Sequence, residues 1–104
     1  MARFEVYRNT GPHTETTPYL LDVQSDLLHG LETRVVVPLR RRDRFPAPLS
    51  ERLTPLFTID GVECFMETPK LAAVPLRLLK NPLASLADRQ ADITSALDFL
   101  FQGY

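Results

Sequence analysis

The pair Asp60-Gly61, set between two short apolar segments, constrains the fold more than any other feature of this sequence. It is typical of a two-residue β-hairpin turn, because both central positions of that turn need a positive φ angle. The turn fixes a register in which Ile59 opposes Val62 and Phe57 opposes Cys64. All four side chains then lie on one face of the hairpin. The sequence therefore predicts an antiparallel sheet with an apolar face turned toward a core.

Strand patterns also occur near the N-terminus and in the middle of the chain. The first residues alternate, with Phe4 and Val6 on one side and Tyr7 on the other, which is typical of a strand with one buried face. Residues 34–39 contain three consecutive valines, a β-branched run that suits a strand buried on both faces. We expect Pro38 to limit that strand or to place it near an edge, because proline cannot donate to a strand ladder.

The remaining elements follow from composition and spacing. Segments 19–24 and 71–79 are strand-like, the second as one or two short pieces interrupted by a proline, and the arginine- and proline-rich segment 40–48 predicts a loop. A helix is predicted to begin at the N-cap Ser85 and to stop at Gly103. Its core-facing stripe, at the period of an α-helix, is formed by Leu86, Ile93, Leu97 and Leu100.

About six strands followed by one helix, without alternation of strands and helices, indicate a largely antiparallel α+β or barrel-like domain. The chain has 104 residues, enough for one compact domain and not two, so residues 1–104 are interpreted as a single domain. A chain with such a small core often gains stability by oligomerising.

Composition narrows the function classes. The formal net charge is -1, so the bulk composition does not point to nucleic acid or to an anionic membrane. Cys64 is the only cysteine, which excludes an intrachain disulfide, and its place on an apolar strand face indicates a core thiol and not a nucleophile. The sequence shows no export signal and no window long enough to span a membrane. We therefore expect a cytoplasmic protein.

No arrangement of metal ligands or catalytic groups is visible, since His13 and His29 are far apart in sequence and lack spaced partners. We therefore expect no metal, no cofactor and no catalytic residues. A charged feature does stand out, the run of arginines at positions 40–42 and 44. We favour a solvated loop that keeps an edge strand from pairing. The alternative is a phosphate-binding patch for nucleic acid or an acidic partner.

The end of the predicted helix is the second feature of the sequence that suggests a functional surface. At about 100° per residue, Phe99 and Phe101 fall on the two flanks of the core stripe and Tyr104 follows, so the last turn is apolar nearly all round. The turn also lacks a basic residue to complement the helix dipole. The functional interpretation is a tip that docks on a macromolecule, without any acid, base or nucleophile. The structural alternatives are a dimer seam and simple packing under the sheet.

Several motifs match a known family in the same order along a chain of similar length. The most specific one is Asp22-Val23-Gln24-Ser25-Asp26. The others are Phe4-Glu5-Val6-Tyr7, Arg34-Val35-Val36-Val37-Pro38-Leu39, Met66-Glu67-Thr68, Leu71-Ala72-Ala73-Val74-Pro75, Asp92-Ile93 and Phe101-Gln102-Gly103-Tyr104. With these motifs the sequence resembles the CcdB toxins of bacterial toxin–antitoxin pairs over almost its whole length.

The resemblance implies a mainly β fold, namely an SH3-like barrel-type antiparallel sheet with a small accessory sheet and a C-terminal α-helix. It implies a homodimer that binds the A subunit of DNA gyrase and poisons that enzyme without being an enzyme itself. It also implies a CcdA-like antitoxin that neutralises the toxin. The toxin–antitoxin complex would repress its own operon, so that operator DNA is contacted only through this complex.

The gyrase-binding set carried over from the resemblance is Leu27, Leu28, Asp98, Phe101, Gln102, Gly103 and Tyr104. Within it, Leu27 and Leu28 correspond to a supporting apolar pair, and Asp98 occupies a position that is usually Asn. Gln102 stands where the family has tryptophan, and Tyr104 stands where it has an aliphatic residue. Three alternatives follow: Tyr104 supplies a substitute ring, the protein is a weakened toxin, or its target differs.

Two other function classes stay open. The same fold family includes ribosome-independent mRNA endonucleases, and Thr33-Arg34-Val35-Val36-Val37 loosely resembles a strand in them. RNA cleavage needs a base and a cationic group that stabilises the transition state. The arginine run supplies a cation, but the sequence names no base. The third class is a retained homologue that binds partners without being toxic.

Overall fold

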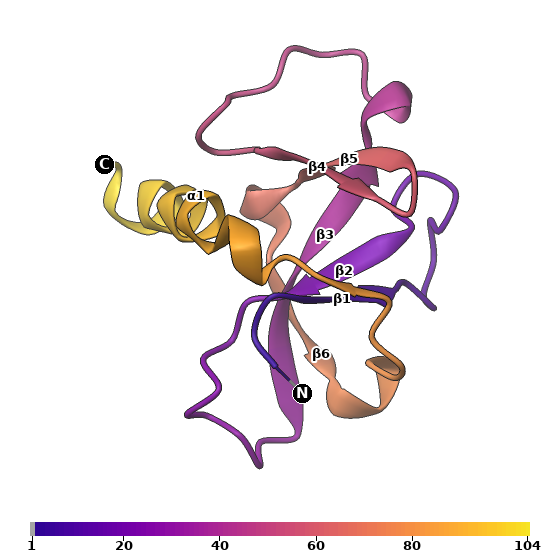
Figure 1. Ribbon diagram of the computed structural model, residues 1–104, viewed down its shortest axis with the longest axis vertical. Coiled ribbons are helices and arrows are strands. Elements are labelled where there is room, and N and C mark those ends of the chain that lie inside the picture. The colour runs from indigo at the N-terminus through magenta and orange to yellow at the C-terminus, as the bar shows by residue number, and fades with distance from the viewer. Residues whose placement is uncertain (1) are drawn as a thin grey trace.

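The computed structural model describes residues 2–104. In chain order its strands and helix are β1 (Glu5–Arg8), β2 (Tyr19–Asp22), β3 (Thr33–Arg41), β4 (Leu56–Ile59), β5 (Val62–Met66), β6 (Ala72–Pro75), β7 (Ala84–Ser85) and α1 (Gln90–Gln102) (Figure 1). Short three-ten turns lie at Arg42–Arg44, Thr68–Lys70, Leu76–Leu78 and Ala87–Arg89.

The strands form one antiparallel sheet in the order β4-β5-β3-β2-β1-β7. The strand β6 pairs with the first half of the long strand β3, off the main path, and forms the small accessory part of the sheet. It is a single strand that ends at Pro75, so segment 71–79 contains one strand and not two. The sheet curls into a nearly closed barrel with α1 on one side (Figure 1). The expected α+β, barrel-type fold with a C-terminal helix is confirmed.

The hairpin of β4 and β5 has the predicted turn and register. Ile59 pairs with Val62, and Phe57 pairs with Cys64. The turn residues Asp60-Gly61 have φ angles of +50° and +78°, which is the backbone that a two-residue hairpin of this kind requires. Three of the four paired side chains are buried and Val62 is half-buried, so the turn and the apolar face select the same register.

Two hydrophobic clusters lie on opposite faces of the sheet. The larger cluster fills the space between the sheet and α1 and includes Val37 and Ile93, both fully buried. The smaller cluster is formed by Tyr7, Leu20, Val36 and Leu79. Because Val36 and Val37 are adjacent in β3 and enter different clusters, the prediction of a strand buried on both faces is confirmed.

The prediction that β1 has a single buried face is wrong, because Tyr7 on its second face is only 1% exposed. The chain that follows β6 folds back over this face and places Leu79 against it. The Tyr7 hydroxyl donates a hydrogen bond to Oε1 of Glu5 at 3.2 Å. Burial, reinforced by the nearby Glu5 carboxylate, raises the pKa of Tyr7 to about 12.

Pro38 neither ends β3 nor lies at an edge, which corrects the sequence prediction. The strand runs through Pro38 to Arg41, so the chain leaves the strand two residues later than the predicted start of the loop at Arg40. β6 pairs with β3 up to Val36, and β5 pairs with it from Leu39 onward. Pro38 lies in the gap between these partners, where its missing N–H costs no ladder bond. Its carbonyl still accepts a hydrogen bond from the N–H of Glu67 at 2.9 Å.

The helix α1 begins at Gln90, five residues after the predicted N-cap Ser85. Ser85 belongs to β7 and pairs with β1, and an extended backbone at this point delays the helix. Its Oγ instead accepts a hydrogen bond at 3.2 Å from the N–H of Ala87, the first residue of the three-ten turn. The predicted stop is confirmed: Gly103 has a φ of +78° and donates its N–H to the Phe99 carbonyl.

Candidate functional site

The last turn of α1 is a bare apolar end on an otherwise anchored helix. Ile93 and Ala96, in the first half of the helix, are fully buried against the barrel. Phe101 is 69% exposed and Tyr104 is 75% exposed, and this end of the helix points away from the sheet (Figure 1). The two rings are therefore not packed under the sheet, which removes that structural alternative. Exposed aromatic rings on a rigid support suit a partner surface.

Gln102 and Gly103 are also exposed and complete the docking tip, which we define as residues 101–104. Asp98 is half-exposed one turn earlier, and the last turn contains no basic side chain. The unpaired carbonyl groups of the helix end and the Asp98 carboxylate together give this region a negative potential. Phe99 does not belong to the bare tip, because the Arg52 guanidinium lies 4.9 Å from the centre of its ring.

The Asp22-to-Asp26 motif forms a buried polar network behind a surface loop. Nε and Nη2 of Arg34 each donate to a carboxylate oxygen of Asp22 at 3.0 Å, and both side chains are almost completely buried. Burial raises the pKa of Asp22, and the hydrogen bonds from Arg34 counteract that rise. This bidentate pair ties the end of β2 to the start of β3.

Gln24 extends the network into the loop between β2 and β3. Its Oε1 accepts a hydrogen bond from the N–H of Val35 at 3.0 Å, and its Nε2 donates to the carbonyl of Leu28 at 2.9 Å. Asp26 accepts a hydrogen bond from the N–H of Arg3 at 2.7 Å. The loop is therefore held by its polar side chains, while its leucines face outward.

Leu27 and Leu28 of this loop are 89% and 53% exposed. The loop and the docking tip lie at separate corners of the molecule (Figure 1). The chain thus brings together the tip residues of the set expected from the resemblance, but it does not bring the leucine pair to them. Leu31, which sequence reasoning missed, is a third exposed leucine of the same loop at 52%.

A comparison with known families decides which family these features belong to. A model of the family described as CcdB protein matches residues 3–103, nearly the whole chain. The chain belongs to the CcdB family. The match includes both the Asp22-to-Asp26 motif and most of the docking tip. CcdB-family membership makes this protein a toxin of a toxin–antitoxin system, with an antitoxin as its partner.

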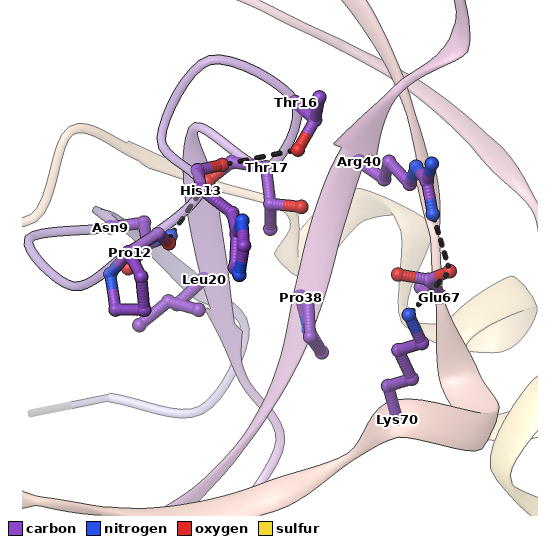
Figure 2. Close-up of a pocket in the computed structure, with 10 residues that line it drawn as sticks. All are labelled: Asn9, Pro12, His13, Thr16, Thr17, Leu20, Pro38, Arg40, Glu67 and Lys70. Atoms are coloured by element: carbon purple, nitrogen blue, oxygen red, sulfur yellow. Dashed lines mark hydrogen bonds and ion pairs between the residues drawn. The ribbon is translucent and has the colours of Figure 1, made fainter. Parts of the chain in front are cut away.

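This CcdB-family protein also has a shallow groove of about 430 Å³ that crosses β2 and β3 (Figure 2). The segment 9–17 forms one wall and includes His13, and Leu20 and Pro38 lie between that wall and the other side. Asn9 fixes the wall, because its Nδ2 donates to the carbonyl groups of residues 12 and 17. Sequence reasoning missed the groove, since its walls come from segments far apart in the chain.

The opposite wall of the groove is charged. Glu67 lies between two cations, with its Oε2 3.4 Å from Nη1 of Arg40 and 3.6 Å from Nζ of Lys70 (Figure 2). The Arg40 guanidinium also lies 4.9 Å from the centre of the Phe45 ring. A carboxylate and two cations at one wall form an ion-pair cluster, and they are the group types that acid–base chemistry on an anionic substrate would use.

Two further arginines of the run, Arg41 and Arg42, are engaged within the chain, whereas Arg44 is exposed. Arg41 forms two hydrogen bonds with Asp43, at 3.0 and 2.9 Å, and this partner lowers the pKa of Asp43. Nη1 of Arg42 donates to the carbonyl groups of Phe45 and Ala47. Arg40 and Arg41 belong to β3, which is paired on both sides, so these two arginines do not guard a free edge of that strand. Ion pairs with Glu67 and Asp43 thus compensate the charges of Arg40 and Arg41, two of the four arginines that a phosphate-binding patch would use.

Other chemistry has little support in the part of the chain that the structure describes. Cys64 is fully buried, and burial raises the pKa of its thiol to about 11, as expected for a core thiol. Among residues 2–104, no group of three or more His, Cys, Asp or Glu side chains is placed to hold a metal ion. The described helices include none that is long and apolar enough to cross a membrane.

Proposed function

We propose that this protein is a non-enzymatic toxin that inhibits DNA gyrase by docking the tip of α1 on the gyrase A subunit. The observation that carries the proposal is the bare, capped end of α1, with Phe101 and Tyr104 exposed on a helix whose first half is buried in the barrel. Within CcdB-family membership, this end is the part of the chain best suited to bind another protein. It binds without chemistry, because its side chains supply no base that would activate the Tyr104 hydroxyl as a nucleophile and no paired acid and base.

The replacement of the family's tryptophan by Gln102 fits this proposal if Tyr104 supplies the ring. Tyr104 is the most exposed aromatic side chain of the tip, and Gly103 turns the chain between the two positions. An aromatic ring stacks on a guanidinium or an apolar surface, whereas a glutamine side chain offers only hydrogen bonds. We therefore assign the stacking contact to Phe101 and Tyr104, with Asp98, Gln102 and Gly103 as their neighbours in the interface.

The partners follow from the same proposal. The toxin acts in the cytoplasm as a homodimer, and Leu27 and Leu28 support its contact with gyrase from the second exposed surface. A CcdA-like antitoxin holds it inactive, and operator DNA is contacted only through the toxin–antitoxin complex. The arginine run agrees with this division in part, since two of its four arginines are paired with carboxylates and not free for DNA.

A cleavage assay tests the docking function. The purified protein is incubated with gyrase and supercoiled plasmid, and the products are denatured before electrophoresis. We expect linear plasmid with the full chain and none after deletion of residues 102–104 or with Phe101→Ala, because the docking surface is lost. Leu56→Ala, which removes an exposed leucine of β4 that belongs to neither proposed contact surface, is the matched control and should keep full activity. Absence of both linear plasmid and supercoiling inhibition with the full chain would refute the proposal.

The groove favours a second candidate function, an RNA endonuclease. Glu67 beside Arg40 supplies the pairing of a carboxylate and a cation that sequence reasoning left incomplete. In such a reaction Glu67 would take the proton of a ribose 2′-hydroxyl, whose oxygen then attacks the adjacent phosphorus. The bond from phosphorus to the 5′-oxygen would break, leaving a 2′,3′-cyclic phosphate, and the released 5′-oxygen would take a proton from water. Single-stranded RNA incubated with the wild type and with Glu67→Gln tests this candidate, and cleavage that disappears in the variant would support it. A protein inactive in both assays would fit the third class, a homologue that binds partners without toxicity, or a toxin with another target.

A further inference from the structure

The second half of α1 has a lateral contact outside the core, made by Arg52 from the segment before β4. Nε of Arg52 donates a hydrogen bond to Oγ of Ser95 at 3.0 Å, and the guanidinium lies 4.9 Å from the centre of the Phe99 ring. Ser95 and Phe99 are four residues apart and therefore lie one above the other on the same face of the helix. One side chain thus spans a full turn of α1 immediately before the docking tip.

The backbone that carries Arg52 is itself fixed. The carbonyl of Leu53 accepts a hydrogen bond from Oγ1 of the buried Thr68 at 2.6 Å. Ser50 closes a turn from the other side, since its carbonyl accepts bonds from the N–H and the hydroxyl of Thr54 at 2.9 and 2.8 Å. The guanidinium is therefore presented to α1 from an anchored segment and not from a loose loop.

The core contacts of α1 are concentrated before the tip. Ile93 and Ala96 are fully buried, Leu100 is half-buried, and residues 101–104 are exposed. A helix held along one stripe can still roll and tilt about that stripe. At the helical period Ser95 and Phe99 lie on the flank of the stripe formed by Ile93 and Ala96, so a contact there restricts this remaining freedom.

We propose that Arg52 is a positioning residue that fixes the direction of the last turn of α1 and so presents Phe101 and Tyr104 to their partner. This inference rests on the docking function proposed above and adds a residue outside the helix to it. The coupling to the tip runs through Phe99, whose ring contacts Arg52 and whose carbonyl accepts the N–H of Gly103 at 3.0 Å. Loosening Phe99 therefore loosens the C-terminal stop.

The test compares two arginines that make the same kind of contact at opposite ends of α1. Arg52→Gln removes the cation from the Phe99 ring. Arg89→Gln removes a cation that lies 4.6 Å from the centre of the Phe57 ring, next to the first turn of α1, and so serves as the matched control. We expect Arg52→Gln to accelerate amide hydrogen exchange at Gly103 about two- to fivefold and to weaken binding to the gyrase A subunit at least as much. Arg89→Gln should change neither quantity.

Two further variants separate positioning from general stability. Arg52→Lys keeps the charge over the ring and should restore part of the Gly103 protection. Combining Arg52→Gln with Phe99→Leu should add little to either single change, because both remove the same contact. The free energy of unfolding of every variant is measured alongside exchange and binding. A loss of binding that comes only from lower stability would appear equally in Arg89→Gln.

Unchanged exchange at Gly103 in Arg52→Gln overturns the inference, whatever happens to gyrase binding. So does a loss of gyrase affinity that Arg89→Gln reproduces. If the wild-type protein does not bind gyrase at all, the docking function fails, and the exchange at Gly103 alone decides whether Arg52 positions the helix end. The two failures are thus distinguishable.

Discussion

At the scale of single residues, the buried pair of Asp22 and Arg34 shows how the family motif acts through structure. Taking two charges out of water is costly, and their attraction repays that cost only with good geometry and further hydrogen bonds. Here the pair is bidentate, and the carbonyl of Gln24 accepts an additional bond from Nη2 of Arg34 at 3.2 Å. We infer that the pair sets how the β2–β3 loop leaves the sheet, more than it adds net stability.

Replacing Asp22 by Asn should therefore destabilise the protein strongly, because Arg34 then keeps a buried charge without a full counter-charge. We expect a loss of about 3 kcal/mol in the free energy of unfolding. Chemical denaturation measures it. Asp26→Asn is the matched control, since the Asp26 carboxylate is exposed and lies 3.6 Å from Arg34, and it should cost less than about 1 kcal/mol. Equal small losses for both variants would contradict this account.

The residue scale also shows a limit of sequence reasoning. Asp22 and Arg34 each lie in a segment that was predicted as a strand, and a charged residue in a buried strand is a signal that a partner exists. Nothing in the linear sequence says that the two meet, because they face each other only after β2 and β3 pair. Arg52 gave no such signal, because an arginine in a loop needs no buried partner. Its partners Ser95 and Phe99 lie 43 and 47 residues further along the chain.

At the scale of elements, local chemistry decided the hairpin but not the start of the helix. The β4–β5 turn is specified by its own residues, because a two-residue loop with positive φ angles is flanked by alternating apolar residues. Ser85 was a good N-cap by residue type alone. The pairing of β7 with β1 holds its backbone extended, and tertiary pairing overrides the local preference.

The hairpin turn can be tested with a single methyl group. Gly61→Ala forces a residue with a Cβ into a φ of +78°, where no other atom lies within 4 Å of the added carbon, so the cost is backbone strain alone. We expect a loss of roughly 1–2 kcal/mol in the free energy of unfolding. Gly11→Ala is the control, because Gly11 has no positive φ and the added Cβ meets only the Asn9 side chain at 3.4 Å. A Gly61→Ala variant as stable as the Gly11→Ala variant would refute the account that the hairpin turn needs a positive φ at this position.

At the scale of the whole molecule, the chain presents two separate apolar surfaces, the docking tip and the leucines at positions 27, 28 and 31. The barrel holds them at different corners (Figure 1). Under the proposed function both surfaces contact gyrase, so the homodimer is then formed through neither of them. The sequence analysis left one structural alternative, in which the tip itself forms the dimer interface. This alternative can be tested only by measuring the oligomeric state.

Deletion of residues 102–104 distinguishes these arrangements. If the tip docks on gyrase, the truncated chain should stay folded and keep the same oligomeric state as the full chain, which we expect to be a dimer of the 11.8 kDa chain. Sedimentation equilibrium gives the mass, and circular dichroism confirms the fold. A full-length dimer that becomes a folded monomer on truncation would identify the tip as the seam. An unfolded truncated protein would mean that the tip supports the core.

The sequence by itself determined the hairpin, the strand buried on both faces, the C-terminal stop at Gly103 and the apolar character of the helix end. Each of these depends on neighbouring residues and on the period of one element. The tertiary structure alone decided that Tyr7 is buried, that Pro38 lies inside β3, that Glu67 lies between two cations, and that Arg52 holds α1 from the side. These features bring together residues from distant segments, and only closure of the barrel sets which of them meet.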